Sequence, residues 1–433
     1  MRHIAIIADD LTGASDSGVQ FARKGLQSQV VFDLEHLSTA TWDYDVVVLD
    51  TDSRSVPREV AFDRVTAAAS QVKRSGFKHV YKKMDSTLRG NLGAELDAVM
   101  DALPFDFAVV APAYPKIGRT TFNGIHALNG VPIDQTEIAR DPKSPVKESD
   151  LVKLFTSQSK RKVGLIPLET LHAGYQQVFD QIKLLHQDHT ELIVFDAVTE
   201  ADMQQIAEML AASEYRILWA GSAGLADYLP KALSFPVGRS EPAELPSSNK
   251  PVLLVAGSIS EVTRSQVSTF NTDPQVTAVE LNTVQMIASD EGSLQEVQRC
   301  RTVLLTALST GSDVSLYASS SPEQVKLSKA AGAERGWDST EVSNRIANVL
   351  GEIASGILQE VELQGVILTG GDTAKAVCKH LGVSGIQLIK EIEPGIPLGK
   401  LVAKSPLWVV TKAGAFGNAN SLLHAKHTLK GEQ

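Results

Sequence analysis

The sequence contains few cysteines and no long hydrophobic run. Cys300 and Cys378 are the only cysteines among 433 residues, which excludes a cysteine-rich zinc cluster and favours a reducing compartment. The short apolar run that begins at Ile4 is followed directly by Asp9, so it lacks the longer core and the cleavage site of a signal peptide. No stretch approaches the roughly 18 consecutive apolar residues of a membrane helix. We therefore expect a soluble, cytoplasmic protein with no membrane partner.

The sequence also lacks an excess of basic residues. Lys and Arg number 41 against 51 Asp and Glu, which gives a formal net charge of −10. Proteins that bind nucleic acid usually carry a basic excess, so we expect no nucleic-acid partner. A small anionic ligand is compatible with this balance, because a local pocket of lysine and arginine can lie in an acidic protein. The composition does not distinguish an enzyme from a binding protein, and it leaves a homo-oligomer open.

Several motifs of nucleotide-binding and hydrolytic proteins are missing. There is no G-x-x-x-x-G-K-[ST] loop, because residues 395–400 read GIPLGK with the wrong spacing. The first predicted strand is not followed by G-x-G-x-x-G, and neither a G-x-S-x-G elbow nor an H-x-x-x-H zinc pair occurs. These absences argue against a P-loop protein and an NAD-linked dehydrogenase. A nucleotide site in this chain would have to be of another type.

Short apolar runs alternate with amphipathic stretches along most of the chain. Many of the runs are apolar throughout, which is typical of strands buried on both faces of a parallel sheet. We predict strands at residues 3–8, 28–32, 45–49, 79–82, 107–111, 192–195, 217–220, 252–256, 276–281, 302–307, 366–369, 386–391 and 407–412. We predict helices at residues 58–74, 92–103, 171–187, 201–212, 223–233, 261–270, 294–300 and 373–381, and a long helical region at 323–361 divided at Gly332, Gly336 and Gly351. The alternation predicts an α/β fold with Rossmann-like, mainly parallel sheets. Residues 113–149, rich in Gly and Pro, are expected to form hairpins or a flap.

One segment interrupts this alternation. Residues 234–251 read SFPVGRSEPAELPSSNKP and contain four prolines and little apolar surface, which is typical of a linker on the protein surface. We therefore predict two α/β domains, residues 1–240 and 250–433, with a cleft between them.

Three loops of the first predicted domain carry dense charge, and each follows a predicted strand. The first contains Asp9 and Asp10, the second ends in Arg54, and the third begins at Lys82 and reads KKMDSTLRGN. Because the carboxyl ends of parallel strands lie at one edge of a sheet, we expect these loops to converge. Lysine and arginine can bind an anion, and carboxylates can accept a hydrogen bond from a hydroxyl group. The set favours a small, polar, hydroxylated anion as the ligand.

These side chains also have ordinary structural interpretations. Asp9 or Asp10 could cap the helix that follows, since Asp is a favoured N-cap residue. Arg54 could be a solvated loop residue. Asp85 or Ser86 could cap the next helix beside surface lysines. Clustering at three strand ends favours the binding interpretation over these alternatives.

The second predicted domain carries loops of a different kind. Glycines follow three of its strands, in the loops at residues 256–260, 369–374 and 412–417. Without a Cβ atom, glycine lets backbone N–H groups approach a phosphate closely. Glycine is also common at such turns, so each loop alone is weak evidence, but three in one domain favour nucleotide binding. Asp372 could hold Mg²⁺ through water or cap its helix.

Taken together, the motifs resemble those of the four-carbon acid sugar kinase family. They occur in order over essentially the whole chain: ADDLTGA at 8–14, KKMDSTLRGN at 82–91, APAYP with GR at 111–119, GGDTA at 370–374, EPGIPLG at 393–399 and TKAGAFG at 411–417. Members of this family phosphorylate D-threonate, D-erythronate or 3-oxo-tetronates at the terminal O4 with ATP. They have an N-terminal acid-sugar-binding domain and a C-terminal nucleotide-binding domain.

The resemblance implies an ATP-dependent kinase with ATP and Mg²⁺ as cofactors and a sugar acid as small-molecule partner. D-threonate is the first choice of substrate, with D-erythronate and 3-oxo-tetronates as alternatives. Implied substrate contacts are Asp10, Arg54, Lys82, Lys83, Met84, Asp85 and Ser86; implied ATP contacts are Ser258, Gly370, Gly371, Asp372, Thr373 and Gly414. We expect Asp10 first, and Asp85 second, to accept the proton of the reacting hydroxyl, with Asp372 near the metal. A non-catalytic sensor of a sugar acid and a nucleotide is the rival interpretation.

Overall fold

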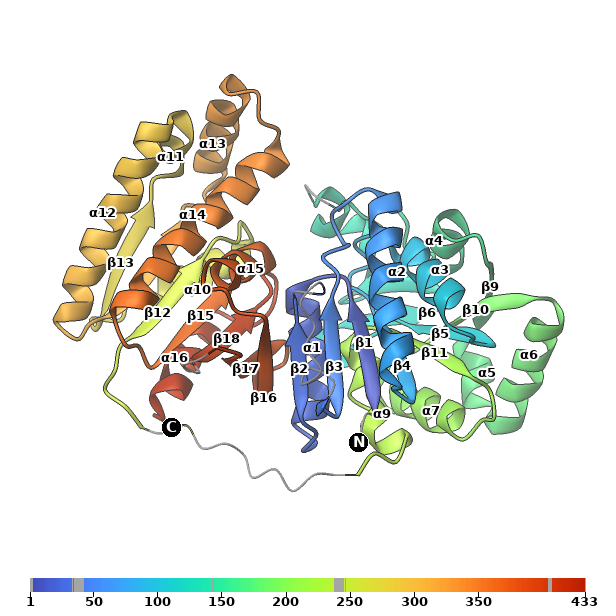
Figure 1. Ribbon diagram of the computed structural model, residues 1–433. Coiled ribbons are helices and arrows are strands. Elements are labelled where there is room, and N and C mark those ends of the chain that lie inside the picture. Colours follow the sequence, from blue (N-terminus) through green and yellow to red (C-terminus); the bar gives the residue numbers. More distant parts are fainter. Residues whose placement is uncertain are drawn as a thin grey trace. The chain divides into compact units, whose positions relative to one another are not determined.

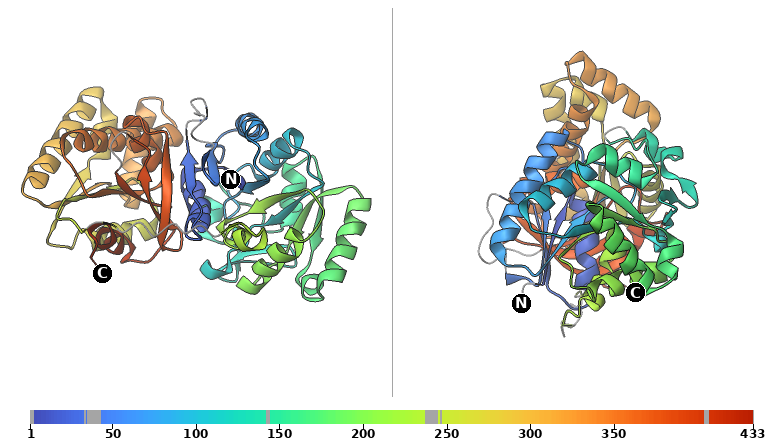
Figure 2. Two further views of the ribbon diagram at one scale, coloured as in Figure 1. Left: turned by 60° about the horizontal axis from the view of Figure 1, so that its bottom comes forward. Right: turned by 90° about the vertical axis from the view of Figure 1, so that its right-hand side faces the viewer.

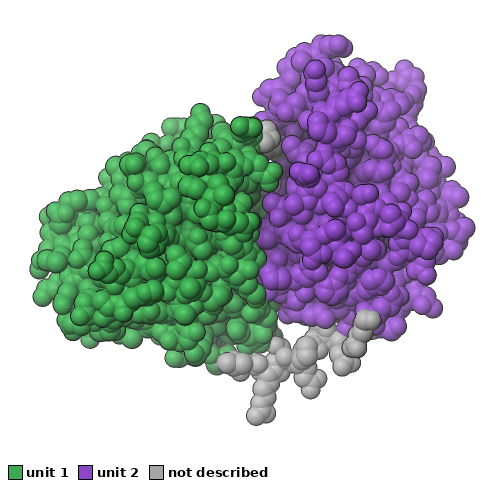
Figure 3. Space-filling model, turned by 180° about the vertical axis from the view of Figure 1, so that it is seen from behind, with its two compact units in different colours: residues 1–240 green, residues 241–433 purple. Residues whose placement is uncertain are grey.

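The first unit is built around a parallel sheet whose central strands are apolar throughout. The computed structural model describes residues 3–32, 34, 43–141, 144–236, 245, 247–403 and 407–432. It divides into two units, residues 1–240 and 241–433 (Figure 3). Among the described residues of the first unit, the main sheet has the strand order β2 (Ser28–Val31), β3 (Val46–Asp50), β1 (Ile4–Ala8), β4 (His79–Lys83), β11 (Ile217–Gly221), β5 (Phe107–Ala111), β10 (Thr190–Phe195), β9 (Lys162–Ile166). All neighbouring pairs are parallel, as predicted.

Helices cover both faces of this sheet (Figures 1 and 2). On one face, α2 (Arg58–Ser75), α3 (Leu92–Ala102) and α4 (Leu151–Gln158) pack on alternate strand residues such as Ala5 and Ile7. On the other face, α1 (Leu11–Ala22) contacts α8 (Ala223–Ala226), and α7 (Glu200–Ala211) contacts α8 and α9 (Leu229–Ala232). Burial of strands on both faces explains why they are apolar at every position rather than at alternate ones.

A small antiparallel sheet occupies the region predicted to form hairpins. It consists of β6 (Arg119–Phe122), β7 (Ile125–Leu128) and β8 (Val131–Pro132). The buried Asp196 holds its first turn, because the carboxylate accepts hydrogen bonds from the backbone N–H groups of Asn123 (2.6 Å) and Gly124 (2.9 Å). The hairpin is thereby fastened to the end of β10.

The second unit repeats the strand–loop–helix pattern. In its described part the strand order is β13 (Val276–Leu281), β14 (Asp313–Ala318), β12 (Val252–Ala256), β15 (Gly365–Thr369), β18 (Trp408–Lys412), β17 (Ile396–Leu401), β16 (Gly385–Glu393). The pairs from β13 to β18 are parallel, whereas β17 is antiparallel to both of its neighbours. The helices are α10 (Glu261–Phe270), α11 (Thr283–Ala288), α12 (Asp290–Ser309), α13 (Pro322–Glu334), α14 (Ser339–Glu360), α15 (Gly371–His380) and α16 (Ser421–Lys430). The α/β fold with mainly parallel sheets is confirmed, while the cleft between the domains stays a prediction.

Some predicted elements are wrong, and the main error is the strand at residues 302–307. These residues lie inside α12, where Cys300, Leu304, Ala307 and Leu308 are buried at helical spacing. The run TVLLTA is rich enough in β-branched and aliphatic residues to resemble a strand when periodicity is ignored. The true strand, β14, lies a few residues later. Three strands, β9, β14 and β17, were not predicted.

Other differences concern where helices begin and end. The helix predicted at 171–187 is divided by Gly174 into α5 (Leu168–His172) and α6 (Tyr175–Gln187), and the one at 223–233 is divided into α8 and α9. In the region 323–361 only Gly336 separates two helices, whereas Gly332 and Gly351 lie within them. Glycine costs only about 1 kcal/mol inside a helix, so packing can override it.

Two further points concern the chain as a whole. Within the described residues, none of the helices combines the length and the apolar composition that crossing a membrane requires. In the predicted linker, residues 237–244 and 246 lie outside the described residues.

Candidate functional site

The three charged loops of the first unit converge at one edge of its sheet. They follow β1, β3 and β4, and β1 lies between the other two with parallel pairing on both sides. All three strands therefore deliver their carboxyl ends to the same edge. The sequence predicted this convergence from the strand pattern alone, and the strand order accounts for it.

Arg54 joins the second loop to the first. Its Nε and Nη2 donate to the carboxylate of Asp9 at 2.7 and 3.0 Å, and its Nη1 and Nη2 donate to Asp10 at 2.7 and 2.6 Å. Four hydrogen bonds thus engage a guanidinium that has five N–H groups. Burial alone would raise the pKa of Asp9, but the Arg54 charge lowers it, so the pair stays ionised.

Asp10 also begins helix α1. One carboxylate oxygen accepts from the backbone N–H of Gly13 at 2.8 Å, and the other accepts from the hydroxyl of Thr12 at 2.6 Å. The capping interpretation therefore applies to Asp10 rather than to Asp9. The Asp10 side chain keeps 19% of its surface exposed, whereas Asp9 is fully buried. Of the two carboxylates, only Asp10 is accessible to a ligand.

The two lysines of the third loop have different environments. Lys82 is buried, and its ammonium lies 2.8 Å from a carboxylate oxygen of Glu95. Lys83 is equally buried, but its ammonium donates to the carbonyl of Met84 at 2.8 Å and has no carboxylate within ion-pair distance among the described residues. The charge of Lys83 is therefore available for an anion, and the charge of Lys82 is already balanced.

Charged groups from all three loops lie close to Gly13. A Cβ atom on Gly13 would lie 2.6 Å from Oδ1 of Asp10, 3.0 Å from Nζ of Lys83 and 3.5 Å from Nη2 of Arg54. Only glycine leaves room for these three groups. Gly13 lies in the ADDLTGA motif, where its residue type alone indicates no role, and proximity in the fold supplies one.

Asp85 is held by its own loop. Its carboxylate accepts from Nε of Arg89 at 2.7 Å and from the hydroxyl of Thr87, and Arg54 lies 3.8 Å away. Burial would raise the pKa of Asp85, but Arg89 and Arg54 hold it well below its usual range. Asp85 is therefore a permanent anion and a weaker base than an ordinary aspartate.

His126 supports the third loop from β7. Nδ1 of the buried ring is hydrogen-bonded to the hydroxyl of Thr121 (2.9 Å), and its Nε2 lies 3.0 Å from the carbonyl oxygen of Ser86. Burial lowers the pKa of His126 to about 4, and the contact with Ser86 only partly opposes this. No motif pointed to His126, because its partners lie 5 and 40 residues away in the chain.

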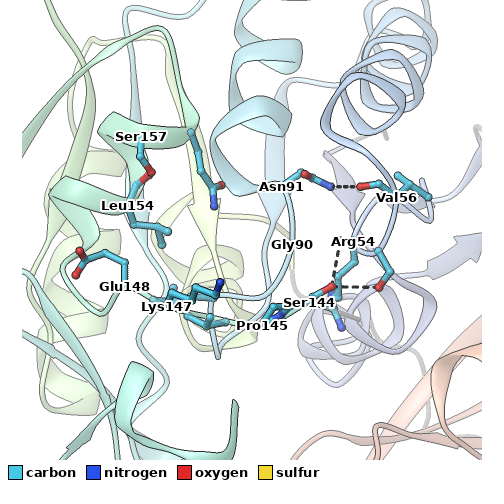
Figure 4. Close-up of a pocket in the computed structure, with 14 residues that line it drawn as sticks. Arg54, Val56, Gly90, Asn91, Ser144, Pro145, Lys147, Glu148, Leu154 and Ser157 are labelled. Atoms are coloured by element: carbon cyan, nitrogen blue, oxygen red, sulfur yellow. Dashed lines mark hydrogen bonds between the residues drawn. The ribbon is translucent and has the colours of Figure 1, made fainter. Parts of the chain in front are cut away.

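A cavity of about 500 Å³ lies beside the Arg54 loop (Figure 4). Asn91 lines it and donates to the carbonyls of Ser53 (3.0 Å) and Val56 (2.9 Å), which ties the start of α3 to this loop. Arg54 borders it with its backbone, since its carbonyl accepts from Ser144 while its guanidinium binds the aspartates. The rest of the lining is Ser55, Leu88, Gly90, Pro145, Val146, Lys147, Glu148, Leu154, Ser157 and Gln158.

The three glycine loops of the second unit also meet. They follow β12, β15 and β18, which are neighbouring parallel strands. The N–H of Gly370 donates to the carbonyl of Lys412 at 2.9 Å, and a Cβ atom on Gly414 would lie 2.4 Å from Oγ of Ser258. The predicted ATP contacts at Ser258, Gly370 and Gly414 therefore come together from three different loops.

The remaining predicted ATP contacts lie at the start of α15. Gly371 is its first residue, Thr373 is buried, and Asp372 is exposed in the first turn. No group of three or more His, Cys, Asp and Glu side chains suited to a metal occurs in the described part of the chain. Mg²⁺ in kinases is usually bound by one or two carboxylates together with phosphate oxygens and water. Asp372, an exposed carboxylate beside the glycine loops, is a ligand of the type that this pattern requires.

Two domain models and several known kinases match this chain. A model of a sugar-binding N-terminal domain matches residues 4–229, and a model of a nucleotide-binding C-terminal domain matches residues 253–422. A D-threonate kinase of Salmonella typhimurium is 34% identical over 98% of both chains. A D-erythronate kinase of Heliobacterium modesticaldum is 31% identical over 97% of this chain and 95% of its own. A 3-oxo-tetronate kinase of Pseudomonas savastanoi is 28% identical, covering 99% of this chain and 97% of its own.

A solved structure has the same fold. A crystal structure of a Haemophilus influenzae protein superposes with a TM-score of 0.74, at 26% identity, over 98% of this chain and 100% of its own.

The burial of His126 predicts a pH-dependent stability. The unfolded chain takes up a proton near pH 6.5, whereas the folded chain does so only near pH 4, so the free energy of unfolding falls as pH falls between these values. We expect the stability advantage of the wild type over His126→Gln to shrink by up to about 3 kcal/mol from pH 7 to pH 4, measured by urea unfolding. His186→Gln, which changes an exposed histidine, is the control and should run parallel to the wild type. A constant difference between the wild type and His126→Gln would contradict the prediction.

Proposed function

The chain belongs to the four-carbon acid sugar kinase family, and we propose that it transfers the γ-phosphoryl group of ATP to the terminal 4-hydroxyl of D-threonate. The observation that carries this proposal is the pairing of unlike charges at one sheet edge. The accessible Asp10 carboxylate and the buried Lys83 ammonium both lie against Gly13. A sugar acid requires both, because it presents a carboxylate at one end and hydroxyl groups along the rest.

Asp10 is proposed to orient the reacting hydroxyl and to accept its proton. The carboxylate is held by Arg54, by Thr12 and by the N–H of Gly13, so its position is determined before the substrate binds. Asp85 is the second candidate, but its pKa is far below the usual range, which makes it a poorer proton acceptor. Phosphoryl transfer depends mainly on positioning and charge neutralisation, so an oriented carboxylate is sufficient.

Lys83 is proposed to bind the carboxylate of the sugar acid. From the sequence, Arg54 and the lysines of the third loop are both candidates for this role, but the Arg54 guanidinium already donates four hydrogen bonds to Asp9 and Asp10. We keep Arg54 among the proposed substrate-binding residues because it positions Asp10 through two hydrogen bonds. Lys82, Met84 and Ser86 are proposed to shape the loop, with Lys82 neutralised by Glu95.

The nucleotide is proposed to bind at the glycine loops of the second unit. The hydroxyl of Ser258 and the backbone N–H of Gly414 would donate to the phosphates, and Gly370, without a Cβ atom, would let the loop approach them closely. The N-terminus of α15 at Gly371 and Thr373 would add its dipole. Asp372 would hold Mg²⁺, which supplies charge neutralisation to the β- and γ-phosphates when bound.

A panel of acceptors tests the proposed reaction. ADP release is measured for the full chain with ATP and D-threonate, L-threonate, D-erythronate or a 3-oxo-tetronate. We expect the highest kcat/KM for D-threonate. A higher kcat/KM for D-erythronate or a 3-oxo-tetronate would show that this acid, rather than D-threonate, is the preferred substrate. ATP binding without ADP release from any acceptor would favour the sensor interpretation instead.

Asp10→Asn tests the proton acceptor. Asparagine is as good an N-cap as aspartate, so helix α1 should persist while the charge is lost. We expect kcat to fall by about 100-fold or more, the size typical of a lost general base, with the KM for ATP unchanged. Turnover close to that of the wild type would show that Asp10 is not the base, and Asp85→Asn would then be measured in the same assay.

Lys83→Met tests the carboxylate anchor. We expect the KM for the sugar acid to rise about tenfold or more, as when a hydrogen bond to a charged group is lost. A neutral tetritol, which has hydroxyl groups but no carboxylate, is the matched control, and its slower turnover should not change with the variant. An unchanged KM for the sugar acid would contradict this role of Lys83 and would favour Arg54 as the residue that binds the carboxylate. Arg54→Ala is a poorer test, because it leaves the buried Asp9 without its partner and destabilises the fold.

A further inference from the structure

The loop after β18 hides its carbonyl groups inside the second unit. This loop, residues 413–418, lies in the connection between β18 and α16, and side chains of α10 and its N-cap donate hydrogen bonds to it. Ser260 and Thr263 donate to the carbonyl of Gly414, both at 2.9 Å. Gln266, itself fully buried, donates to the carbonyls of Phe416 (3.0 Å) and Asn418 (2.8 Å).

The ammonium of Lys412 is at the centre of this arrangement. Lys412 is the last residue of β18, and its side chain is fully buried. Four oxygens surround Nζ: the carbonyls of Ala413 (2.8 Å), Gly414 (3.2 Å) and Phe416 (3.2 Å), and Oγ1 of Thr263 (3.2 Å). None of them belongs to a carboxylate, and within the described residues no acidic group lies at ion-pair distance. Burial lowers the pKa of Lys412 to about 7.

In a trans peptide the carbonyl oxygen and the N–H of the next residue point in opposite directions. Where a carbonyl of this loop points inward, the following N–H therefore points outward. The N–H of Phe416 is used within the loop, by the carbonyl of Ala413. The N–H groups of Gly414, Ala415 and Gly417 donate to no other group in the described part of the chain. Several unused N–H groups close together are the arrangement that binds anions. The loop therefore offers the N–H groups of Gly414 and Ala415 as donors to the proposed nucleotide site.

We propose that Lys412 is the positioning residue of the nucleotide site. Its ammonium gathers the carbonyls of the 413–418 loop inside the protein and thereby holds the N–H groups of Gly414 and Ala415 toward the phosphates. The inference rests on the proposed function, since it assigns a role within the same nucleotide site. Lys412 acts through the loop and through its charge, and no contact of its side chain with the nucleotide is required.

A purely structural role explains this lysine less well than the proposed positioning role does. A buried charge without a carboxylate partner is costly, and an aliphatic side chain would fill the same space at lower cost. Lysine at this position therefore indicates that the carbonyls need a donor that an apolar residue cannot provide. The positive charge beneath the loop also favours a phosphate above it.

Lys412→Met tests the inference by direct binding. Methionine keeps the apolar stem and removes the charge and its donors. ATP and ADP affinities of the full chain are measured by titration calorimetry without acceptor, and folding is checked by circular dichroism at the assay temperature. We expect both dissociation constants to rise about tenfold or more, with the KM for the sugar acid unchanged. Lys379→Met, on an exposed lysine of α15, should bind as the wild type does. A folded Lys412→Met chain with unchanged nucleotide affinity would overturn the inference.

A second pair of variants decides the matter if Lys412→Met fails to fold. Thr263→Val has the same shape but loses the hydroxyl that joins Nζ of Lys412 to the carbonyl of Gly414, whereas Thr263→Ser keeps it. We expect weaker nucleotide binding for the valine variant and recovery for the serine variant. Wild-type affinity in Thr263→Val would count against the inference. If the acceptor panel gives no ADP release but nucleotide binding still depends on Lys412, the proposed reaction fails and the inference stands.

Discussion

The four hydrogen bonds from Arg54 to Asp9 and Asp10 are the interaction on which the sugar-acid site depends. Two carboxylates at adjacent positions repel each other, and one of them is fully buried. A single guanidinium donates to both carboxylates, and it joins the loop after β3 to the loop after β1. The same contact determines where Asp10 lies. Lys83 then approaches across Gly13 from the third loop.

The two proposed sites would bind an anion in different ways. The first unit uses side-chain charges, which are balanced pair by pair: Arg54 with two aspartates, Lys82 with Glu95, and Arg89 with Asp85. Lys83 is left with only a carbonyl partner. In the second unit the proposed donors are backbone N–H groups, and the ammonium of Lys412 donates to carbonyls of the same loop. A net charge of −10 therefore describes the surface of the chain and says little about either site.

Much of the fold and the candidate site was predictable from local sequence. Apolar strands ended by acidic, basic or glycine-rich loops were correctly placed in most cases, because burial on both faces of a parallel sheet leaves an unambiguous pattern. The errors have physical causes. The run at 302–307 was mistaken for a strand because it is apolar and β-branched, although its burial follows a helical period. His126 and Glu95 were missed because their contacts with the third loop join different elements, β7 and α3, to that loop, and no sequence motif marks such contacts.

By itself, the sequence determined the α/β class, the strand ends at which the functional loops lie, and the family to which the chain belongs. These follow from residue types and their order, which act locally or are shared among relatives. Only the tertiary structure decided how the charges are distributed among partners. Which lysine is neutralised by Glu95, which aspartate caps α1 and which carbonyls surround Lys412 depend on strand order and close approach. Electrostatic pairing is decided by distances of a few ångströms between charged and polar groups, and the order of residue types does not encode those distances.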